Sequence, residues 1–131
     1  MRKFVEGLKE MQKEFGISLK EDMGRDPFMT EIGENILLQE IVLHDLAHVE
    51  EYMADEPIPT ELALMPAESV IRYEPLGVVA CIGAWNFPFQ TTLKPVLNAI
   101  CAGNCVLVKP SEISPSSSAV IKKFCDKYLK E

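Results

Sequence analysis

Two short apolar runs separated by a helical pattern constrain this chain more than any other feature. The runs occupy residues 77–83 and 104–109, and each is too short for an ordinary helix and rich in β-branched residues. Between them, residues 91–103 place large aliphatic side chains at three- and four-residue spacing and end in Gly103, a typical helix-ending residue. The pattern predicts a βαβ unit whose two parallel strands are each buried on both faces.

The segments that leave these two strands share one edge of the predicted sheet. A crossover through a helix makes the strands parallel, so residues 84–88 and 110–112 emerge on the same side. Open α/β sheets bind their ligands at that edge.

The residues before this unit predict helices and a hairpin. An amphipathic helix over 1–15 is expected to precede a short helix that Ser18 caps and Gly24 ends. Thr30 is expected to cap a long helix over 31–53. The predicted apolar face of that helix holds Ile32, Ile36, Leu43, Leu46 and Met53, with Val42 and Val49 beside them.

With the remaining segments, the sequence predicts an α/β fold whose cofactor-binding domain is incomplete. Strands at 62–65 and 69–74 predict a β-hairpin able to pair with another chain, and Ser114 with Pro115 begins a last helix. We divide the chain into an N-terminal helical region with a hairpin, 1–75 (oligomerisation-type strands about 62–74), and the first part of a nucleotide-binding domain, 76–131. A third strand is expected where the sequence stops.

Charge and composition exclude some classes of binding partner. The formal net charge is −7, the pI is near 4.9, and Lys and Arg form no cluster, which argues against nucleic acid as a partner. No run of about 18 apolar residues and no signal peptide is found, so we expect no membrane segment and a cytoplasmic location. The four cysteines stand in apolar segments, form no Cys-x-x-Cys pair, and are expected to be structural: Cys81, Cys101, Cys105 and Cys125.

Two histidines one helical turn apart offer a metal-site hypothesis. His44 and His48, with Glu40 or Glu51 as a third ligand, resemble the zinc-binding helix of metalloproteases with Asp45 in place of the usual glutamate. Both histidines face away from the predicted apolar face, so a solvated helix surface is the favoured interpretation, and the expected set of metal ligands is none.

The segment 73–79, followed by 82–89, 102–104 and 108–112, resembles the NAD(P)-dependent aldehyde dehydrogenase family. It looks closest to the class 3, fatty-aldehyde branch, and the likeness covers nearly the whole chain. The resemblance implies a Rossmann-like cofactor domain, NAD with NADP possible, an aldehyde as small-molecule substrate and a homodimer in the full-length form. In the family a cysteine thiolate attacks the aldehyde, hydride passes to the nicotinamide, and water hydrolyses the thioester.

The resemblance also assigns site residues. Asn86 matches the asparagine whose amide donates to the tetrahedral oxyanion, for which the alternative is an Asx-type turn. Ala84 and Trp85 match an apolar wall beside the cofactor, where ordinary core packing is the alternative. Lys109 and Glu112 match the residues that bind the adenosine ribose hydroxyls, where a surface ion pair is the alternative. Pro110 and Ser111 are expected to fix and cap that loop.

The family's nucleophilic cysteine and general-base glutamate match no residue of this sequence, so the 131-residue chain alone is predicted not to oxidise aldehydes. Three alternatives stay open at this point. One is a truncated, non-catalytic pseudoenzyme or nucleotide-binding fragment. The second is the histidine metal site, and the third is reduction of an acyl phosphate with NADPH.

Overall fold

The computed structural model describes residues 2–129. The predicted limits at Met1 and Glu131 lie outside these residues. In chain order the elements are α1 (Arg2–Glu10), α2 (Gln12–Met23), α3 (Pro27–Thr30), the π-helical turn η1 (Glu31–Ile36), α4 (Leu37–Met53), β1 (Glu56–Ile58), the 3-10 turn η2 (Leu62–Leu64), β2 (Ser69–Ile71), β3 (Val78–Ile82), α5 (Pro88–Cys101), β4 (Cys105–Lys109) and α6 (Pro115–Tyr128).

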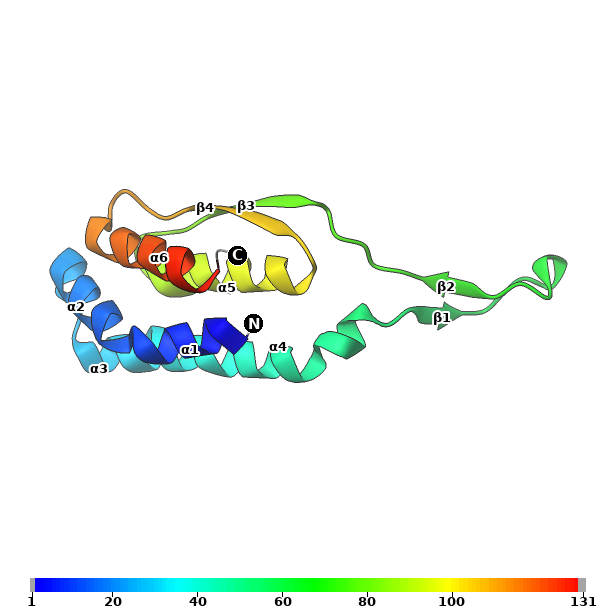
Figure 1. Cartoon of the computed structure of the whole chain (residues 1–131), viewed down its shortest axis with the longest axis horizontal. Helices are drawn as coiled ribbons and strands as arrows, with labels where there is room; N and C mark the ends of the chain where they lie inside the picture. Colours follow the sequence, from blue (N-terminus) through cyan, green and yellow to red (C-terminus); the bar gives the residue numbers. More distant parts are fainter. Residues whose placement is uncertain (1, 130–131) are drawn as a thin grey trace.

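Three layers stack in the body of the molecule (Figure 1). The strands β3 and β4 form one outer layer, α5 packs against both strands and beside α6, and both helices rest on α1, α2 and α4. The hairpin β1–β2 projects away from this body (Figure 1). Mixed helices and strands confirm the predicted α/β class.

The hydrophobic core fills the space between the middle layer and the N-terminal helices. Phe15 of α2 stacks on Phe89 of α5 with ring centroids 4.0 Å apart, and Phe4 of α1 meets Phe124 of α6 edge-on at 5.0 Å. All four rings are at most 1% exposed. Burying such side chains stabilises a fold by roughly 1.5 to 3 kcal/mol each. Residues from both predicted parts share this core, and the domain division itself stays a prediction.

The βαβ unit is confirmed. β3 and β4 are parallel, with Val78 opposite Cys105 and Ile82 opposite Lys109. Gly103 adopts a φ of 78° just after α5, the left-handed conformation expected of a helix-ending glycine. The helix begins three residues before the predicted start, at Pro88.

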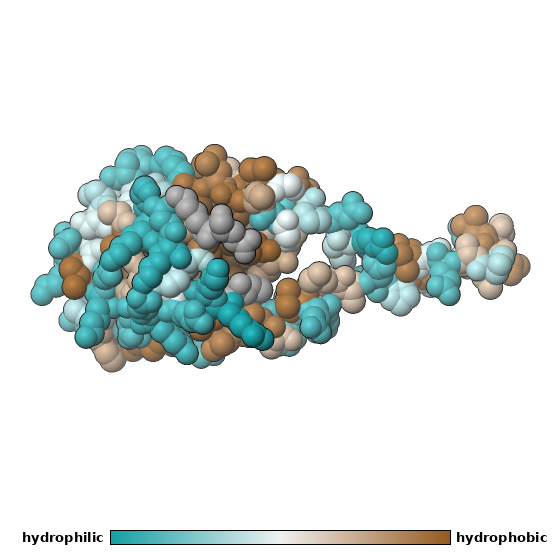
Figure 2. All heavy atoms as spheres, viewed as in Figure 1, coloured by the Kyte–Doolittle hydropathy of each residue, from teal (hydrophilic) through white to brown (hydrophobic). Residues whose placement is uncertain are grey.

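The expectation that both strands are buried on both faces is wrong for the described residues. α5 covers one face, while on the other Val78, Ile82 and Leu107 are 67 to 75% exposed. Figure 2 shows apolar side chains gathered over the position of these strands. A continuous apolar run is typical of a strand that is buried on both faces. Within residues 2–129, only the face toward α5 is buried.

Two predicted helix caps are also wrong. Ser18 lies inside α2, where its buried hydroxyl donates to the carbonyl of Phe15. Asp26, followed by Pro27 at the first helical position, caps α3 by accepting from the N–H of Phe28 at 2.9 Å. Thr30 is therefore interior to a helical run that continues through η1 into α4. Gly24 does end α2, as predicted, with a φ of 67°.

The predicted apolar face of the long helix differs from the buried one. Leu38 and Val42 are the fully buried residues of α4, because the π-helical turn η1 adds a residue and shifts the phase of the repeat. Of the predicted face, Leu46 packs against the core, whereas the other four residues are 43 to 73% exposed: Ile32, Ile36, Leu43 and Met53.

The hairpin is present with a different first strand. β2 pairs antiparallel with β1, with Glu56 opposite Ile71, while residues 62–64 form the 3-10 turn η2 in a longer connection. Two prolines around Ile58 obscured this strand, because proline is uncommon inside strands other than edge strands.

Candidate functional site

All seven predicted site residues lie at one edge of the β3–β4 sheet. The parallel register places Ile82 opposite Lys109, so the loops that follow both strands leave side by side. The first loop, residues 84–87, carries Ala84, Trp85 and Asn86. The second loop, residues 110–114, follows Lys109 and carries Pro110, Ser111 and Glu112.

The first loop is tied to the start of α5. The hydroxyl of Thr91 accepts from the N–H of Ala84 at 3.0 Å and lies 2.9 Å from the carbonyl oxygen of Phe87. Trp85 is 49% exposed and Asn86 is exposed, so both side chains face outward from the edge. Within residues 2–129 the Asn86 side-chain amide makes no hydrogen bond and is free to donate to a ligand.

At its root the first loop depends on a glycine. A Cβ built on Gly83 would stand 1.9 Å from the Thr92 hydroxyl oxygen, closer than any real contact. The N–H of Gly83 donates to the carbonyl of Lys109 at 2.9 Å and extends the strand pairing by one residue. Only glycine lets the end of β3 approach α5 this closely.

In the second loop the two charged residues contact each other. Lys109 Nζ lies 2.5 Å from Glu112 Oε2, and both side chains are more than half exposed. The Lys109 hydrogen bond lowers the pKa of the Glu112 carboxyl, so this group stays ionised at neutral pH. Ser111 is buried, its hydroxyl accepts from the N–H of Ile113, and its carbonyl accepts from the Ser118 hydroxyl at 2.6 Å.

A buried ion pair links the first loop to the N-terminal helices. Arg25 Nη1 lies 2.6 Å from Glu34 Oε1, Nη2 donates to the carbonyl of Asn86, and the guanidinium sits 4.5 Å above the ring of Phe87. The other Glu34 oxygen accepts from the N–H groups of Phe89 and Gln90 at 2.8 and 2.9 Å. Burial raises the pKa of Glu34, although these donors and Arg25 oppose the shift.

The sequence model of the aldehyde dehydrogenase family matches residues 1–128 of the chain. The chain belongs to the aldehyde dehydrogenase family.

Named relatives place it near class 3, as predicted. It is 40% identical over 118 residues to aldehyde dehydrogenase family 3 member H1 of Arabidopsis thaliana, covering 90% of this chain and 24% of the relative. It is 35% identical over 127 residues to family 3 member B2 of Mus musculus, covering 97% and 26%. The chain therefore spans about a quarter of the length of these curated relatives.

Solved structures agree in fold. A substrate-bound Staphylococcus aureus AldH superposes with a TM-score of 0.93 at 28% identity, covering 97% of this chain and 28% of that one. A lactaldehyde dehydrogenase superposes with a TM-score of 0.80 at 25% identity, covering 98% and 26%. The α/β arrangement described above is thus that of the N-terminal portion of aldehyde dehydrogenases.

The cysteines of this aldehyde dehydrogenase chain are poorly suited to nucleophilic attack. Burial raises the pKa of the Cys81 and Cys101 thiols, and it raises the pKa of Cys125 to about 11, so all three are protonated at neutral pH. Cys105 stands in an apolar segment, as described, but it is exposed on the open sheet face, so the expectation that it is a buried structural cysteine is wrong for the described residues.

His44 and His48 stack on each other along α4, with ring centroids 4.3 Å apart. His48 Nδ1 lies 2.7 Å from the carbonyl oxygen of His44 in the preceding turn, which occupies one of its two ring nitrogens. Among residues 2–129 no group of three or more His, Cys, Asp or Glu side chains is placed to hold a metal ion. Within the same residues no helix combines the length and apolar character needed to cross a bilayer.

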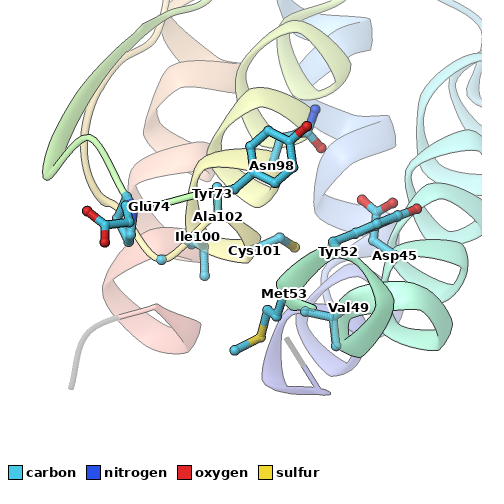
Figure 3. Close-up of a pocket in the computed structure, with 12 residues that line it drawn as sticks. Asp45, Val49, Tyr52, Met53, Tyr73, Glu74, Asn98, Ile100, Cys101 and Ala102 are labelled. Atoms are coloured by element: carbon cyan, nitrogen blue, oxygen red, sulfur yellow. The ribbon is translucent and has the colours of Figure 1, made fainter. Parts of the chain in front are cut away.

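One pocket of the described residues lies away from the predicted site. A pocket of about 690 Å³ opens at the other edge of the sheet, between α4, the end of α5 and the segment before β3 (Figure 3). Asp45 and Tyr52 of α4 and Cys101 of α5 are among the residues that line it (Figure 3). None of the seven predicted residues lines this pocket.

Three residues that hold the first loop were missed from sequence. Neighbouring residues give no sign of the roles of Arg25 and Glu34, because the α5 partners of Glu34 lie 55 and 56 residues away. Thr91 carries a local signal that could have been used. It stands four residues after Phe87, where a hydroxyl at a helix start commonly accepts or donates to the preceding turn.

Proposed function

We propose that this chain forms one half of the cofactor site and the oxyanion donor of an enzyme that oxidises an aldehyde to a carboxylate with NAD or NADP. The observation that carries the proposal is the gathering of Asn86, Trp85, Lys109 and Glu112 at one sheet edge of an aldehyde dehydrogenase chain. Ligands of open α/β sheets bind at such edges.

Asn86 would supply a fixed donor. Its side-chain amide is unengaged within residues 2–129, while its backbone is held by Arg25. A preorganised amide of this kind stabilises the tetrahedral oxyanion that forms when a thiolate attacks an aldehyde, and its loss typically costs about 10² to 10³ in rate. The Asx-turn alternative has no support, because the Asn86 side chain caps none of the described N–H groups.

Lys109 and Glu112 would bind the ribose hydroxyls of the cofactor, which supplies the hydride acceptor when bound. Their mutual ion pair is exposed, so exchanging it for ligand contacts costs little free energy. A carboxylate at this place repels a 2′-phosphate, which favours NAD. NADP remains the second cofactor, and a Canis lupus familiaris relative, 34% identical over 122 residues, is named as dimeric and NADP-preferring.

Pro110 and Ser111 would hold the second loop in place. Pro110 restricts the backbone directly after β4, and the buried Ser111 accepts hydrogen bonds from the Ile113 N–H and from the Ser118 hydroxyl of α6. Ala84 and Trp85 would wall the cofactor beside the first loop. We keep a homodimer, an aldehyde as small-molecule substrate and a cytoplasmic location as expectations for the protein that contains this chain.

A second candidate is a non-catalytic nucleotide-binding or interaction fragment. The exposed apolar face of β3 and β4 favours it, because that face needs a cover that residues 2–129 do not provide. Burial disfavours the thiolate form of Cys81, Cys101 and Cys125, and the isolated chain is expected to be inactive under either candidate.

Isothermal titration of the 131-residue chain with NAD tests the cofactor site, beside a circular-dichroism melt that establishes folding. Lys109→Ala and Glu112→Ala should each weaken binding about tenfold or more, the loss expected for a hydrogen bond to a charged group. Lys122→Ala is the control, because it removes another exposed lysine–carboxylate pair, with Asp126, that lies within α6 and outside the predicted site. A folded chain that binds no NAD, or equal losses in all three variants, would reject the proposed cofactor site.

A further inference from the structure

We propose that Arg25 is a positioning residue for Asn86, holding the oxyanion donor in place from the N-terminal helices. The inference rests on the oxyanion role proposed above. It assigns to the first helical layer a direct part in the geometry of the reaction site.

The Arg25 guanidinium joins three groups at once. One nitrogen pairs with Glu34 at 2.6 Å, another donates to the Asn86 carbonyl, and its planar face lies 4.5 Å above the Phe87 ring. The guanidinium offers five donors in a rigid planar fork, so it can serve two acceptors and stack on an aromatic ring together. No other cation contacts the 84–87 segment within residues 2–129.

The turn at the end of α2 directs the Arg25 side chain toward the first loop. Gly24, with a φ of 67°, ends α2 and turns the chain so that Arg25 leaves the helix toward the sheet edge. The Arg25 side chain is only 16% exposed and that of Glu34 is fully buried. A long side chain confined in this way has little freedom to leave its partners.

Glu34 completes the clamp on the same stretch of chain. While one of its oxygens holds Arg25, the other accepts from the N–H groups of Phe89 and Gln90 at the start of α5. The carbonyl of Asn86 and the first turn of the following helix are therefore fixed to one buried ion pair. A rotation of the Asn86 peptide, which would redirect its side chain, requires the Arg25 contact to break.

This precision matters because an oxyanion donor acts over a short range. Catalytic groups need to be held within about 0.5 Å of the productive position, and a misplacement of about 1 Å can cost roughly 100-fold in rate. The competing explanation is that Arg25 merely neutralises the buried Glu34 and stabilises the fold. The two explanations differ in whether the effect of Arg25 passes through Asn86.

The first measurement uses the chain itself. In ¹H–¹⁵N NMR spectra of the 131-residue chain, Arg25→Met should shift the Phe87 backbone amide and the Asn86 side-chain amide, and Arg25→Lys should shift them less. Lys123→Ala, which removes the exposed pair with Glu14, is the control and should leave both signals in place. If Arg25→Met is folded and these two signals do not move, the positioning role is overturned.

The second measurement is a double-mutant cycle on kcat in the aldehyde-oxidising protein that contains this chain. Arg25→Met alone should lower kcat about 10- to 100-fold and leave the KM for NAD unchanged, with partial rescue by Arg25→Lys. In an Asn86→Ala background the same change should have little further effect, because the group it positions is gone.

The outcomes separate the two proposals. If Asn86→Ala lowers kcat and Arg25→Met does not, or if Arg25→Met costs the same in both backgrounds, Arg25 is a structural residue and only this inference fails. If Asn86→Ala leaves kcat unchanged, the oxyanion role is wrong and the positioning role fails with it. Should Arg25→Met not fold, the same cycle with Arg25→Lys decides the question, since that variant keeps a positive charge beside Glu34.

Discussion

The helices α5 and α6 begin in the same way, but the carboxylate that caps α5 is buried and the one that caps α6 is partly exposed. Each follows a loop at the sheet edge, and each has its first N–H groups capped by a carboxylate from the N-terminal layer. Glu34 caps α5 at Phe89 and Gln90, and Asp22 caps α6 through both oxygens at Ser116 and Ser117, at 2.9 and 2.7 Å. Glu34 is fully buried and paired with Arg25, whereas Asp22 is partly exposed.

The two loops differ in how tightly buried contacts hold them, and this difference suits them to different functions. The first loop, with the proposed oxyanion donor, is fixed by buried contacts from distant parts of the chain. The second loop carries the exposed Lys109–Glu112 pair, which can exchange its contacts for those of a ligand. A rigid donor suits a reaction that needs accurate placement, and an adjustable pair suits cofactor binding and release.

The largest expected effect comes from Glu34→Ala. It leaves Arg25 without its buried partner and removes the cap of α5, and breaking a buried ion pair typically costs about 3 to 5 kcal/mol of stability. Urea unfolding of the purified chain measures the change. Glu14→Ala removes an exposed pair with Lys123 and should cost at most about 1 kcal/mol. Equal losses in the two variants would contradict the distinction between buried and exposed pairs.

Gly83→Ala should destabilise the root of the first loop by about 1 to 3 kcal/mol, the usual cost of overpacking. The new methyl group would meet the Thr92 hydroxyl at 1.9 Å. Gly16→Ala is the matched control, because its methyl group would meet only Pro27, at 3.9 Å, inside a helix where alanine is favoured by up to about 1 kcal/mol. Unfolding curves should move in opposite directions, and a neutral Gly83→Ala would refute the close approach of β3 and α5.

Asp22→Ala should cost about 1 kcal/mol, the typical value of a helix cap. The loss should be confined to α6 and α2, which Asp22 joins. Hydrogen exchange of the Ser116 and Ser117 amides checks this, with faster exchange expected there and unchanged exchange at Phe89. Faster exchange at the start of α5 would show that the two caps are coupled and not independent.

How far the sequence predicted these features depended on how local their contacts are. The start of α6 at Ser114 and Pro115, the end of α5 at Gly103 and the parallel strands all follow from neighbouring residues, and all are confirmed. The surface ion pair that was the alternative interpretation of Lys109 and Glu112 is also present, between residues three positions apart. These features need no knowledge of what else packs nearby.

Contacts between distant segments could not be foreseen. The Glu34 cap joins residues 55 positions apart, and nothing near Pro88 reveals that an acid will arrive there. The π-helical turn shifted the buried face of α4, and Gly33 inside that turn does not by itself reveal that the helical phase changes there. The exposure of one face of β3 and β4 was not predicted. An apolar run indicates that both faces of a strand pack against other residues, but it does not indicate which residues these are.

The two capping carboxylates, Asp22 and Glu34, should affect the pH dependence of stability in opposite directions. Hydrogen bonds from Ser117 and Ser116 outweigh the opposing effect of burial and lower the pKa of Asp22. Its contribution is therefore complete above the unfolded-state pKa of about 3.9 and is lost as the pH falls through the lower folded-state value. For Glu34 burial dominates and the pKa is raised, so its titration favours the folded state in acid and loses that contribution as the pH rises through the folded-state value.

Substitution of each acid by its amide should therefore tilt the stability curve in opposite directions. Asp22→Asn should flatten the loss of stability in acid, because a carboxylate that must be protonated is gone. Glu34→Gln should steepen that loss between neutral pH and about pH 4, because the opposing contribution is removed. Free energies of unfolding in urea, measured at several pH values for the chain and both variants, give the two slopes. Slopes that change in the same direction would mean that burial does not distinguish Glu34 from Asp22, and the contrast between a fixed first loop and an adjustable second loop would lose its electrostatic basis.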